Sequence, residues 1–134
     1  MNTAHIGTVA VLSFVAVWNN ANAGDNHYEC AVVSALKITE QGSLLPHWSH
    51  ESLVGAKFTV DRITGRIIGG PLDNANFKTE VIDKGSRETS FQAFSRSTQK
   101  SHTAQIEIQE FASGLEKPFV GFITLSYPGV YSGI

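Results

Sequence analysis

The sequence predicts an all-β protein, an antiparallel meander of six to seven strands that forms a small barrel or sandwich, with one short helix near residues 49–54. Several short segments alternate apolar and polar residues with the period of a strand. Turn residues recur between them roughly every 8–14 residues, and only one segment carries helix-capping signals. Because the apolar faces of such strands need a cover, a single isolated sheet is not expected.

The first 23 residues have the layout of a secretory signal peptide. An apolar run over residues 6–17 precedes polar residues and an Ala-Asn-Ala tripeptide that ends at Ala23, as at a cleavage site. No Lys or Arg precedes the run, which departs from the usual positive n-region, and a buried N-terminal strand or helix is the alternative. The run is shorter than the roughly 20 residues that cross a bilayer core, so we expect no stable membrane span.

We therefore expect cleavage after Ala23, export to the periplasm or the medium, and a single β-rich domain over residues 24–134. The chain has 10 Lys and Arg and 12 Asp and Glu, which give a net charge of −2 and form no run of one sign. This pattern provides no electrostatic footprint for nucleic acid and no basic face for an anionic membrane.

Cys30 is the only cysteine of the chain. Exported proteins usually carry paired cysteines or none, so three states remain: a buried free thiol, an intermolecular disulfide, or a thiol that has lost an intramolecular partner. Its place in an apolar alternation favours the buried thiol, in which the residue acts as a small hydrophobe.

The first strand is expected over residues 28–39. One face carries apolar residues at a spacing of two, broken once at Ser34, and the other face is mixed. The residues expected to face the core are Cys30, Val32, Leu36 and Ile38.

A short helix follows the turn at residues 40–43. Ser49 can cap its free N–H groups, Glu51 lies in the first turn, where a carboxylate is favourable, and Gly55 can adopt the left-handed closing conformation.

The strongest local signal is a β-hairpin over residues 57–69. Asp61 is expected to accept hydrogen bonds from N–H groups of the turn, and Gly65 to supply the positive φ that closes it. A loop over residues 70–76 comes next.

Four more strands are expected over residues 77–83, 89–96, 104–109 and 119–125. The first of them should turn Phe77, Thr79 and Val81 to one face. The last is apolar on both faces, so it lies centrally in a sheet or meets a partner.

Two histidines three residues apart, His47 and His50, could meet one Zn²⁺ or Cu²⁺ from one helical turn. A closed site would need a further ligand, such as His27, His102 or a carboxylate. The alternative is a solvated helix turn that Trp48 anchors to the sheet. A calcium loop at residues 73–76 is disfavoured because Ala75 falls where an oxygen ligand is required, and an Asx-rich turn is preferred. We expect no cofactor.

Nucleophilic catalysis has no motif to support it. The chain has no G-x-S-x-G elbow and no His or Asn signature around Cys30. Asp61 or Asp83 could in principle form a triad with His102 and a serine, but any chain of this size offers such combinations. The protein is therefore expected not to be an enzyme.

Most phenylalanines are expected to fill the core, and a ligand cavity inside a small barrel is the alternative. Three of them, Phe94, Phe111 and Phe122, fall out of phase with the main apolar face of their segments. These three are candidates for a second apolar surface that meets a partner.

Two parts of the chain, residues 55–70 and residues 117–133, resemble a family of small exported bacterial proteins of unknown function. The resemblance covers most of the mature chain and implies no activity or ligand. It also implies a cysteine after the final Ser-Gly that pairs with one near the N-terminus, such as Cys30. Ile134 stands there instead, so the resemblance implies an altered or truncated end and a Cys30 without its partner.

The leading hypothesis is a small exported β-sheet binding protein of a bacterial envelope, whose partner is another envelope protein or a small apolar ligand. One alternative is a small secreted metal-dependent or hydrolytic enzyme that uses His47, His50 or His102. Another is a structural or assembly subunit in which residues 119–125 pair with the edge of a neighbouring chain.

Overall fold

The computed structural model describes residues 26–98, 101–124 and 128–134. The signal peptide expected over residues 1–23 lies outside these residues. The described residues form nine strands and one short helix, in this order: β1 (His27–Ile38), β2 (Leu44–Pro46), α1 (His50–Leu53), β3 (Lys57–Asp61), β4 (Ile67–Ile68), β5 (Phe77–Lys84), β6 (Phe91–Ser97), β7 (Thr103–Ile108), β8 (Phe119–Ile123) and β9 (Gly129–Gly133).

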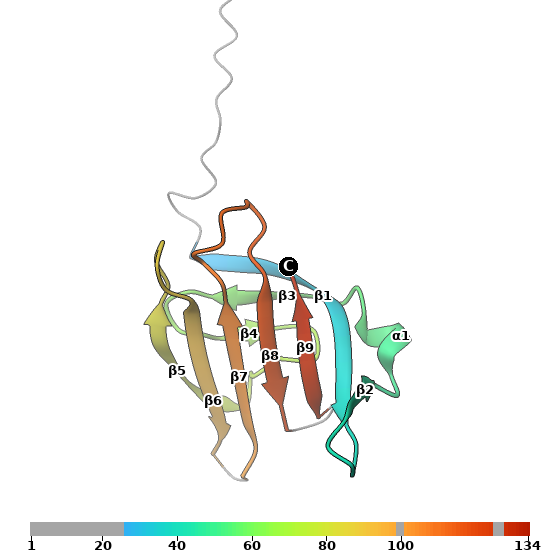
Figure 1. Cartoon of the computed structure of the whole chain (residues 1–134). Helices are drawn as coiled ribbons and strands as arrows, with labels where there is room; N and C mark the ends of the chain where they lie inside the picture. Colours follow the sequence, from blue (N-terminus) through green and yellow to red (C-terminus); the bar gives the residue numbers. More distant parts are fainter. Residues whose placement is uncertain (1–25, 99–100, 125–127) are drawn as a thin grey trace, which may run out of the picture.

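The strands build one antiparallel sheet that curls into a half-barrel, which confirms the predicted fold class (Figure 1). The strand order is β4-β3-β1-β9-β8-β7-β6-β5, and β2 pairs with β1 as a side branch. The segment from β5 to β9 is a meander in which each strand pairs with the next. Two of the nine strands, β2 and β9, have no counterpart among those expected from the sequence.

The long strand β1 joins the two parts of the curled sheet. Its first half pairs with β3, and its second half pairs with β9. Between them the register shifts from Val32 to Ser34, which marks a β-bulge. The bulge changes which residues face the core, so the predicted core face is wrong beyond Ser34: Ala35 is fully buried and Ile38 is 72% exposed.

The strand β8 lies centrally, between β7 and β9. This position accounts for its apolar residues on both faces. Both of its edges are paired within the chain, so neither is open to a strand from a neighbour.

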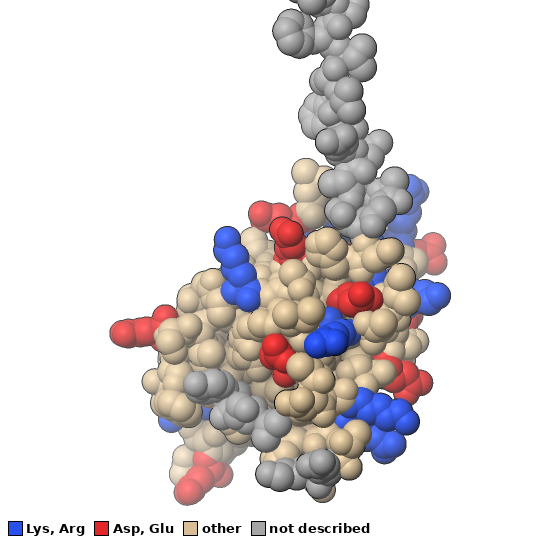
Figure 2. Space-filling model, turned by 180° about the vertical axis from the view of Figure 1, so that it is seen from behind, with Lys and Arg blue, Asp and Glu red and all other residues tan. Residues whose placement is uncertain are grey.

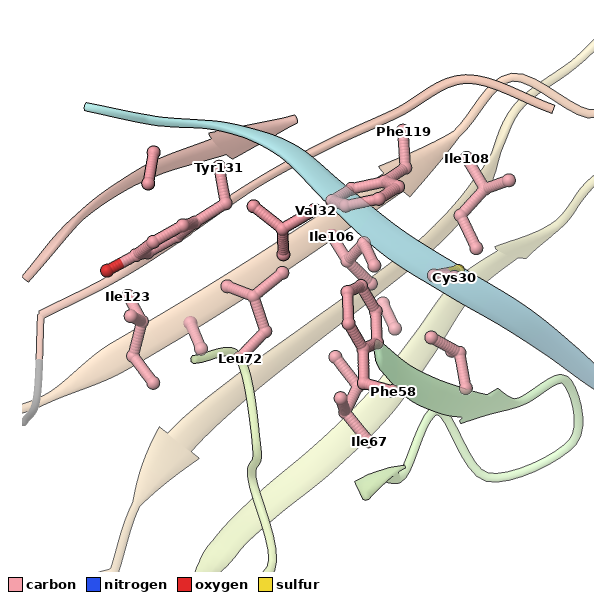
Figure 3. Close-up of a cluster of buried hydrophobic side chains, with 14 of the residues drawn as sticks. Cys30, Val32, Phe58, Ile67, Leu72, Ile106, Ile108, Phe119, Ile123 and Tyr131 are labelled. Carbon is pink, nitrogen blue, oxygen red and sulfur yellow. The ribbon is translucent and has the colours of Figure 1, made fainter. Parts of the chain in front are cut away.

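The hydrophobic core lies in the hollow of the curled sheet (Figure 3). Val32 and Cys30 project into it from β1, and Phe58 and Ile67 from the β3–β4 hairpin. Opposite them lie side chains of the meander, among them Ile106, Ile108, Phe119, Ile123 and Tyr131. Leu72, from the loop after β4, is fully buried and lies where a side chain on Gly121 would otherwise point.

The predicted hairpin is confirmed in β3 and β4. Asp61 Oδ1 accepts hydrogen bonds from the N–H groups of Ile63 and Thr64, each at 2.8 Å. Gly65 has φ +74°, in the left-handed region that favours glycine. The carboxylate and the glycine thus close the turn as their positions in the sequence indicate.

The helix α1 is confirmed but shorter than predicted, and it is not capped as predicted. Ser49 is the N-cap residue, yet its side chain makes no capping hydrogen bond. Its backbone N–H donates instead to Nδ1 of His47, at 3.0 Å. Gly55 adopts φ +86° after the helix, as expected. Within the described ranges, no helix is long and apolar enough to cross a membrane.

Candidate functional site

The two histidines proposed as metal ligands have different environments. His47 is buried, its Nδ1 accepts the hydrogen bond from Ser49, and its ring packs against Trp48 and Tyr131 at centroid distances of 4.9 and 6.3 Å. His50 begins α1 and is partly exposed. In the part of the chain that the structure describes, no three His, Cys, Asp or Glu side chains gather closely enough to hold a metal ion.

The two carboxylates considered for a catalytic triad stabilise turns by accepting hydrogen bonds from backbone N–H groups. Asp61 closes the β3–β4 hairpin, and the N–H groups of Thr64 and Ile63 lower the pKa of its carboxyl. Asp83 Oδ1 accepts hydrogen bonds from the Gly85 N–H at 2.8 Å and from the Thr89 hydroxyl at 3.2 Å. The neighbour of His102 is the Thr124 hydroxyl, 3.4 Å from Nδ1.

Two of the three phenylalanines proposed as a partner surface share one face of the sheet. Phe94 of β6 and Phe122 of β8 are both cross-strand neighbours of Gln105 in β7. Phe94 is half-buried, and Phe122 is 40% exposed. Phe111 lies apart from them in the loop that follows β7.

The structure adds a feature that the sequence did not predict, a groove of about 770 Å³ at one end of the curled sheet. One side is formed by residues 27–31 of β1 and residues 57–59 of β3, with Ile68 of β4. The other side is formed by residues 115–117, in the loop between β7 and β8, with Ile108 and Ile134. Figure 1 shows this loop rising at the end of the sheet that β1 crosses.

Apolar side chains line the groove and are open to solvent, Leu115 almost completely. Ile68 is 57% exposed, Ile134 is 43% exposed and Leu115 is 99% exposed. Cys30 and Ile108 are buried and belong to both the groove lining and the hydrophobic core. Ligand-binding sites are usually concave and combine apolar walls with polar groups, and the lining of this groove contains both kinds of side chain.

The charged side chains of the groove balance in sign. Lys57 and Lys117 are matched by Glu29 and Glu116, and His27 Nε2 lies 3.8 Å from the Glu29 carboxylate. Charges of both signs are also interspersed on the face seen in Figure 2. The charge of the groove therefore favours neither an anionic nor a cationic ligand.

A cluster of three side chains ties the loop after β7 to β1. The Tyr28 hydroxyl donates a hydrogen bond to Oε2 of Glu110, at 2.7 Å. The Arg62 guanidinium lies 3.6 Å from Oε1 of Glu110 and 4.7 Å from the centre of the Tyr28 ring. Burial of Tyr28 and its hydrogen bond to Glu110 raise the pKa of this phenol. The phenol therefore stays protonated as a donor.

The loop is also closed at its base. The Gln109 N–H donates to the Pro118 carbonyl at 2.8 Å, and the Lys117 ammonium donates to the Ala112 carbonyl. Together with the Tyr28–Arg62–Glu110 cluster, these bonds fix the loop that forms one wall of the groove. A preformed site loses less conformational entropy on binding than one that has to be ordered.

Cys30 is buried, as its place in the apolar alternation predicts, and forms no disulfide within the chain. Burial raises its pKa to about 12. Because the thiolate is the reactive form, this thiol does not suit nucleophilic chemistry at neutral pH.

Sequence reasoning missed the groove because its walls are distant in the chain. Tyr28 and Glu110 are 82 residues apart, and no short motif reports their contact. One signal was present, since Leu115 is an isolated large apolar residue in a polar loop. Comparisons of the chain with protein-family models, curated proteins and solved structures found no match.

Proposed function

We propose that this protein is an exported, non-catalytic binding protein of a bacterial envelope, and that the groove between β1 and the β7–β8 loop is its binding site. The observation that carries the proposal is the groove itself. Its volume of about 770 Å³ falls within the range of roughly 300–1,000 Å³ that ligand pockets occupy.

The chemistry of the groove supports binding rather than catalysis. Its one thiol is kept protonated by burial, and its charged groups are lysines and glutamates of balanced sign, of which Lys117 is partly buried and donates to the Ala112 carbonyl. The exposed apolar side chains Ile68, Leu115 and Ile134 provide surface that a ligand would remove from water. Export is supported by the signal-like layout of residues 1–23.

The experiment is native mass spectrometry of the protein purified, without reductant, from the compartment to which it is exported. We expect a species heavier than the bare chain. Leu115→Asp should abolish that species, because it places a charge on the apolar wall. Ile63→Asp is the matched control, since Ile63 is 65% exposed on the β3–β4 turn and does not line the groove.

A bare chain in the wild type, or an added mass that Leu115→Asp leaves unchanged, would contradict the groove as the binding site. The same spectra test the export prediction, because the mature chain should begin at Gly24. A mass that includes residues 1–23 would contradict that prediction.

A further inference from the structure

We propose that the outer face of the strands β5 to β9 is a self-association surface, on which a second copy of this chain docks about a two-fold axis. The proposal goes beyond the proposed function, since none of the residues that carry it lines the groove. Two observations carry it: an apolar stripe that crosses this face of the sheet, and charged side chains of opposite sign on the two sides of the stripe.

The stripe is one row of cross-strand neighbours that runs from β6 to β1. In the order of the sheet, its members are Phe94, Gln105, Phe122, Val130 and Leu36. The residues beside them along the strands, such as Ala93, Ile106 and Tyr131, are buried in the core, so the row points away from it. Figure 1 looks onto this outer face, with β3 and β4 behind it. An exposed row that is apolar at four of its five positions is typical of a contact surface.

Charges of opposite sign lie on the two sides of the stripe. In one direction along the strands, the next outward-facing row holds the carboxylates of Asp83 and Glu107, on either side of Gln92. In the other direction, the next row holds Lys78 and Arg96, which are exposed. Neither cation forms an ion pair with a residue that the structure describes. The outer face is therefore negative on one side of the stripe and positive on the other.

This arrangement is complementary to itself in one orientation. A two-fold axis along the stripe turns the second copy over, so that its acidic side lies over the basic side of the first copy. An axis along the strands would instead set like charges against each other, which is unfavourable. The first axis also keeps the strands of the two sheets aligned, as in sheets that pack face to face. The charges therefore select a second copy as the occupant and fix its orientation.

With the axis along the stripe, each strand lies over its own copy. Phe94 and Phe122 then pack against the same rings of the second copy, which removes apolar surface from water. The Gln105 amide between them can donate to and accept from its own copy, because an amide carries both donors and an acceptor. Glu80 lies in line with the stripe on the edge strand β5, so its repulsion from its own copy falls at the rim, where solvent screens it.

The flanking charges meet in the same orientation. Lys78 lies opposite Asp83 of the second copy, because both belong to β5 and occupy the two flanking rows. Glu107 of the second copy lies opposite Thr103, the cross-strand neighbour of Arg96. Arg96 is therefore displaced sideways from that carboxylate by one strand spacing, about 4.8 Å, which its long side chain spans. Two-fold symmetry makes each of these contacts twice.

The size of the face sets the strength of association. It is about 24 Å wide across the six strands from β5 to β1 and about 14 Å long between the two charged rows. This area is well below the roughly 800 Å² per partner that a stable complex buries. We therefore expect a weak dimer, with a dissociation constant on the order of 10–100 μM.

The test is sedimentation velocity of the purified protein up to about 500 μM, a concentration above the expected dissociation constant. Phe122→Ser removes the most exposed ring of the stripe, and Ile63→Ser is its matched control on the β3–β4 turn. Arg96→Glu and Glu107→Lys each reverse one flanking charge. Arg66→Glu is the control for charge reversal, because Arg66 is exposed on the β3–β4 hairpin, across the core from this face. Circular dichroism checks that each variant is folded.

We expect the wild type and both control variants to dimerise, and Phe122→Ser to abolish the dimer. Arg96→Glu and Glu107→Lys should each weaken it at least about tenfold, because two-fold symmetry makes every reversed contact twice. An equimolar mixture of these two variants should dimerise again, since each reversed charge then meets an opposite one. Raising the NaCl concentration should weaken the wild-type dimer by screening the flanking charges. The salt series needs no variant, so it tests the charge pairing even if Glu107→Lys does not fold.

A wild type that stays monomeric, or a dimer that Phe122→Ser leaves unchanged, would overturn the self-association surface. A mixture of Arg96→Glu and Glu107→Lys that stays monomeric, or a wild-type dimer that salt does not weaken, would overturn the proposed axis. Dimers that Leu115→Asp abolishes and Phe122→Ser spares would assign self-association to the groove instead. A dimer has twice the mass of the chain, so it is distinct from a ligand adduct in the groove, and either proposal can fail without the other.

Discussion

The side-chain amide of Asn74 donates a hydrogen bond to the Ser95 hydroxyl, 3.0 Å away in the buried seam between the loop after β4 and strand β6. The same amide donates to the Gly65 carbonyl at 3.1 Å and accepts from the Ile67 N–H at 2.7 Å. The Ser95 hydroxyl also lies 2.8 Å from that of Thr79 in β5. One buried side chain therefore joins the hairpin, its following loop and the far end of the sheet.

Asn74→Ala should destabilise the fold by about 2–4 kcal/mol, because it leaves the Ile67 N–H and the Gly65 carbonyl without their side-chain partner in a buried site. Urea unfolding should show a lower midpoint with an unchanged slope. Asn76→Ala is the matched control, because Asn76 is exposed in the same loop and should change stability by less than about 0.5 kcal/mol. Equal midpoints for the two variants would contradict the role of Asn74.

Gly65→Ala should destabilise the protein more than Gly42→Ala, although both glycines have positive φ, +74° and +81°. A Cβ on Gly65 would lie 2.8 Å from Cγ2 of Thr79 and 2.9 Å from Cβ of Ala93, whereas one on Gly42 would meet nothing within 4 Å. Each substitution carries left-handed strain of about 1–2 kcal/mol, and Gly65→Ala adds about 1–3 kcal/mol of overpacking. Thermal unfolding of the two variants tests this difference. Equal losses of stability would contradict the prediction, because they would mean that the hairpin moves aside to admit the Cβ at residue 65.

The sequence predicts most local features of this fold, because they depend on residues close in the chain. The β3–β4 turn forms as expected, since Asp61 and Gly65 act within one short loop. The predicted face of β1 fails after the bulge, because one extra residue in the register reverses every later side chain. The strand β9 was missed because Gly129 and Gly133, at its ends, resemble turn residues.

The candidate site lay beyond sequence reasoning for a different reason. The groove depends on which distant segments of the chain meet, and that follows from the order of strands in the sheet. His27 and Glu29 look like ordinary surface residues of a strand. They line the groove only because the fold brings residues 115–117 to the same place, which no local pattern reports.

Tyr28→Phe should reduce stability by about 1 kcal/mol, since it removes the 2.7 Å hydrogen bond to the half-buried carboxylate of Glu110 but keeps the ring against Phe91 and Arg62. A double-mutant cycle with Glu110→Gln measures the coupling between the two side chains. We also expect faster amide exchange in residues 110–117, because the loop loses one of its ties to β1. Zero coupling and unchanged exchange would contradict the role of this bond in holding the groove.

The buried thiol of Cys30 should react slowly in the folded protein. Burial raises its pKa from 9.0 to about 12, so at pH 8 its thiolate fraction is about a thousandfold lower than in the unfolded chain. Labelling with iodoacetamide should therefore be slow in buffer and fast in denaturing urea. Equally fast labelling in both would show that the thiol is accessible and ionised in the fold.

Because folding raises the pKa of Cys30, the free energy of unfolding should depend on pH in the alkaline range. A group whose folded pKa is raised contributes fully below its unfolded pKa, and its contribution is lost as pH rises through the folded pKa. Cys30 should therefore contribute fully below about pH 9, and that contribution should decline as pH rises toward 12. Cys30→Ala should unfold at lower urea at neutral pH because of the smaller side chain, but its stability should fall less steeply above pH 9. Parallel slopes for the wild type and Cys30→Ala over this range would mean that other groups, and not the Cys30 thiol, govern the alkaline loss of stability.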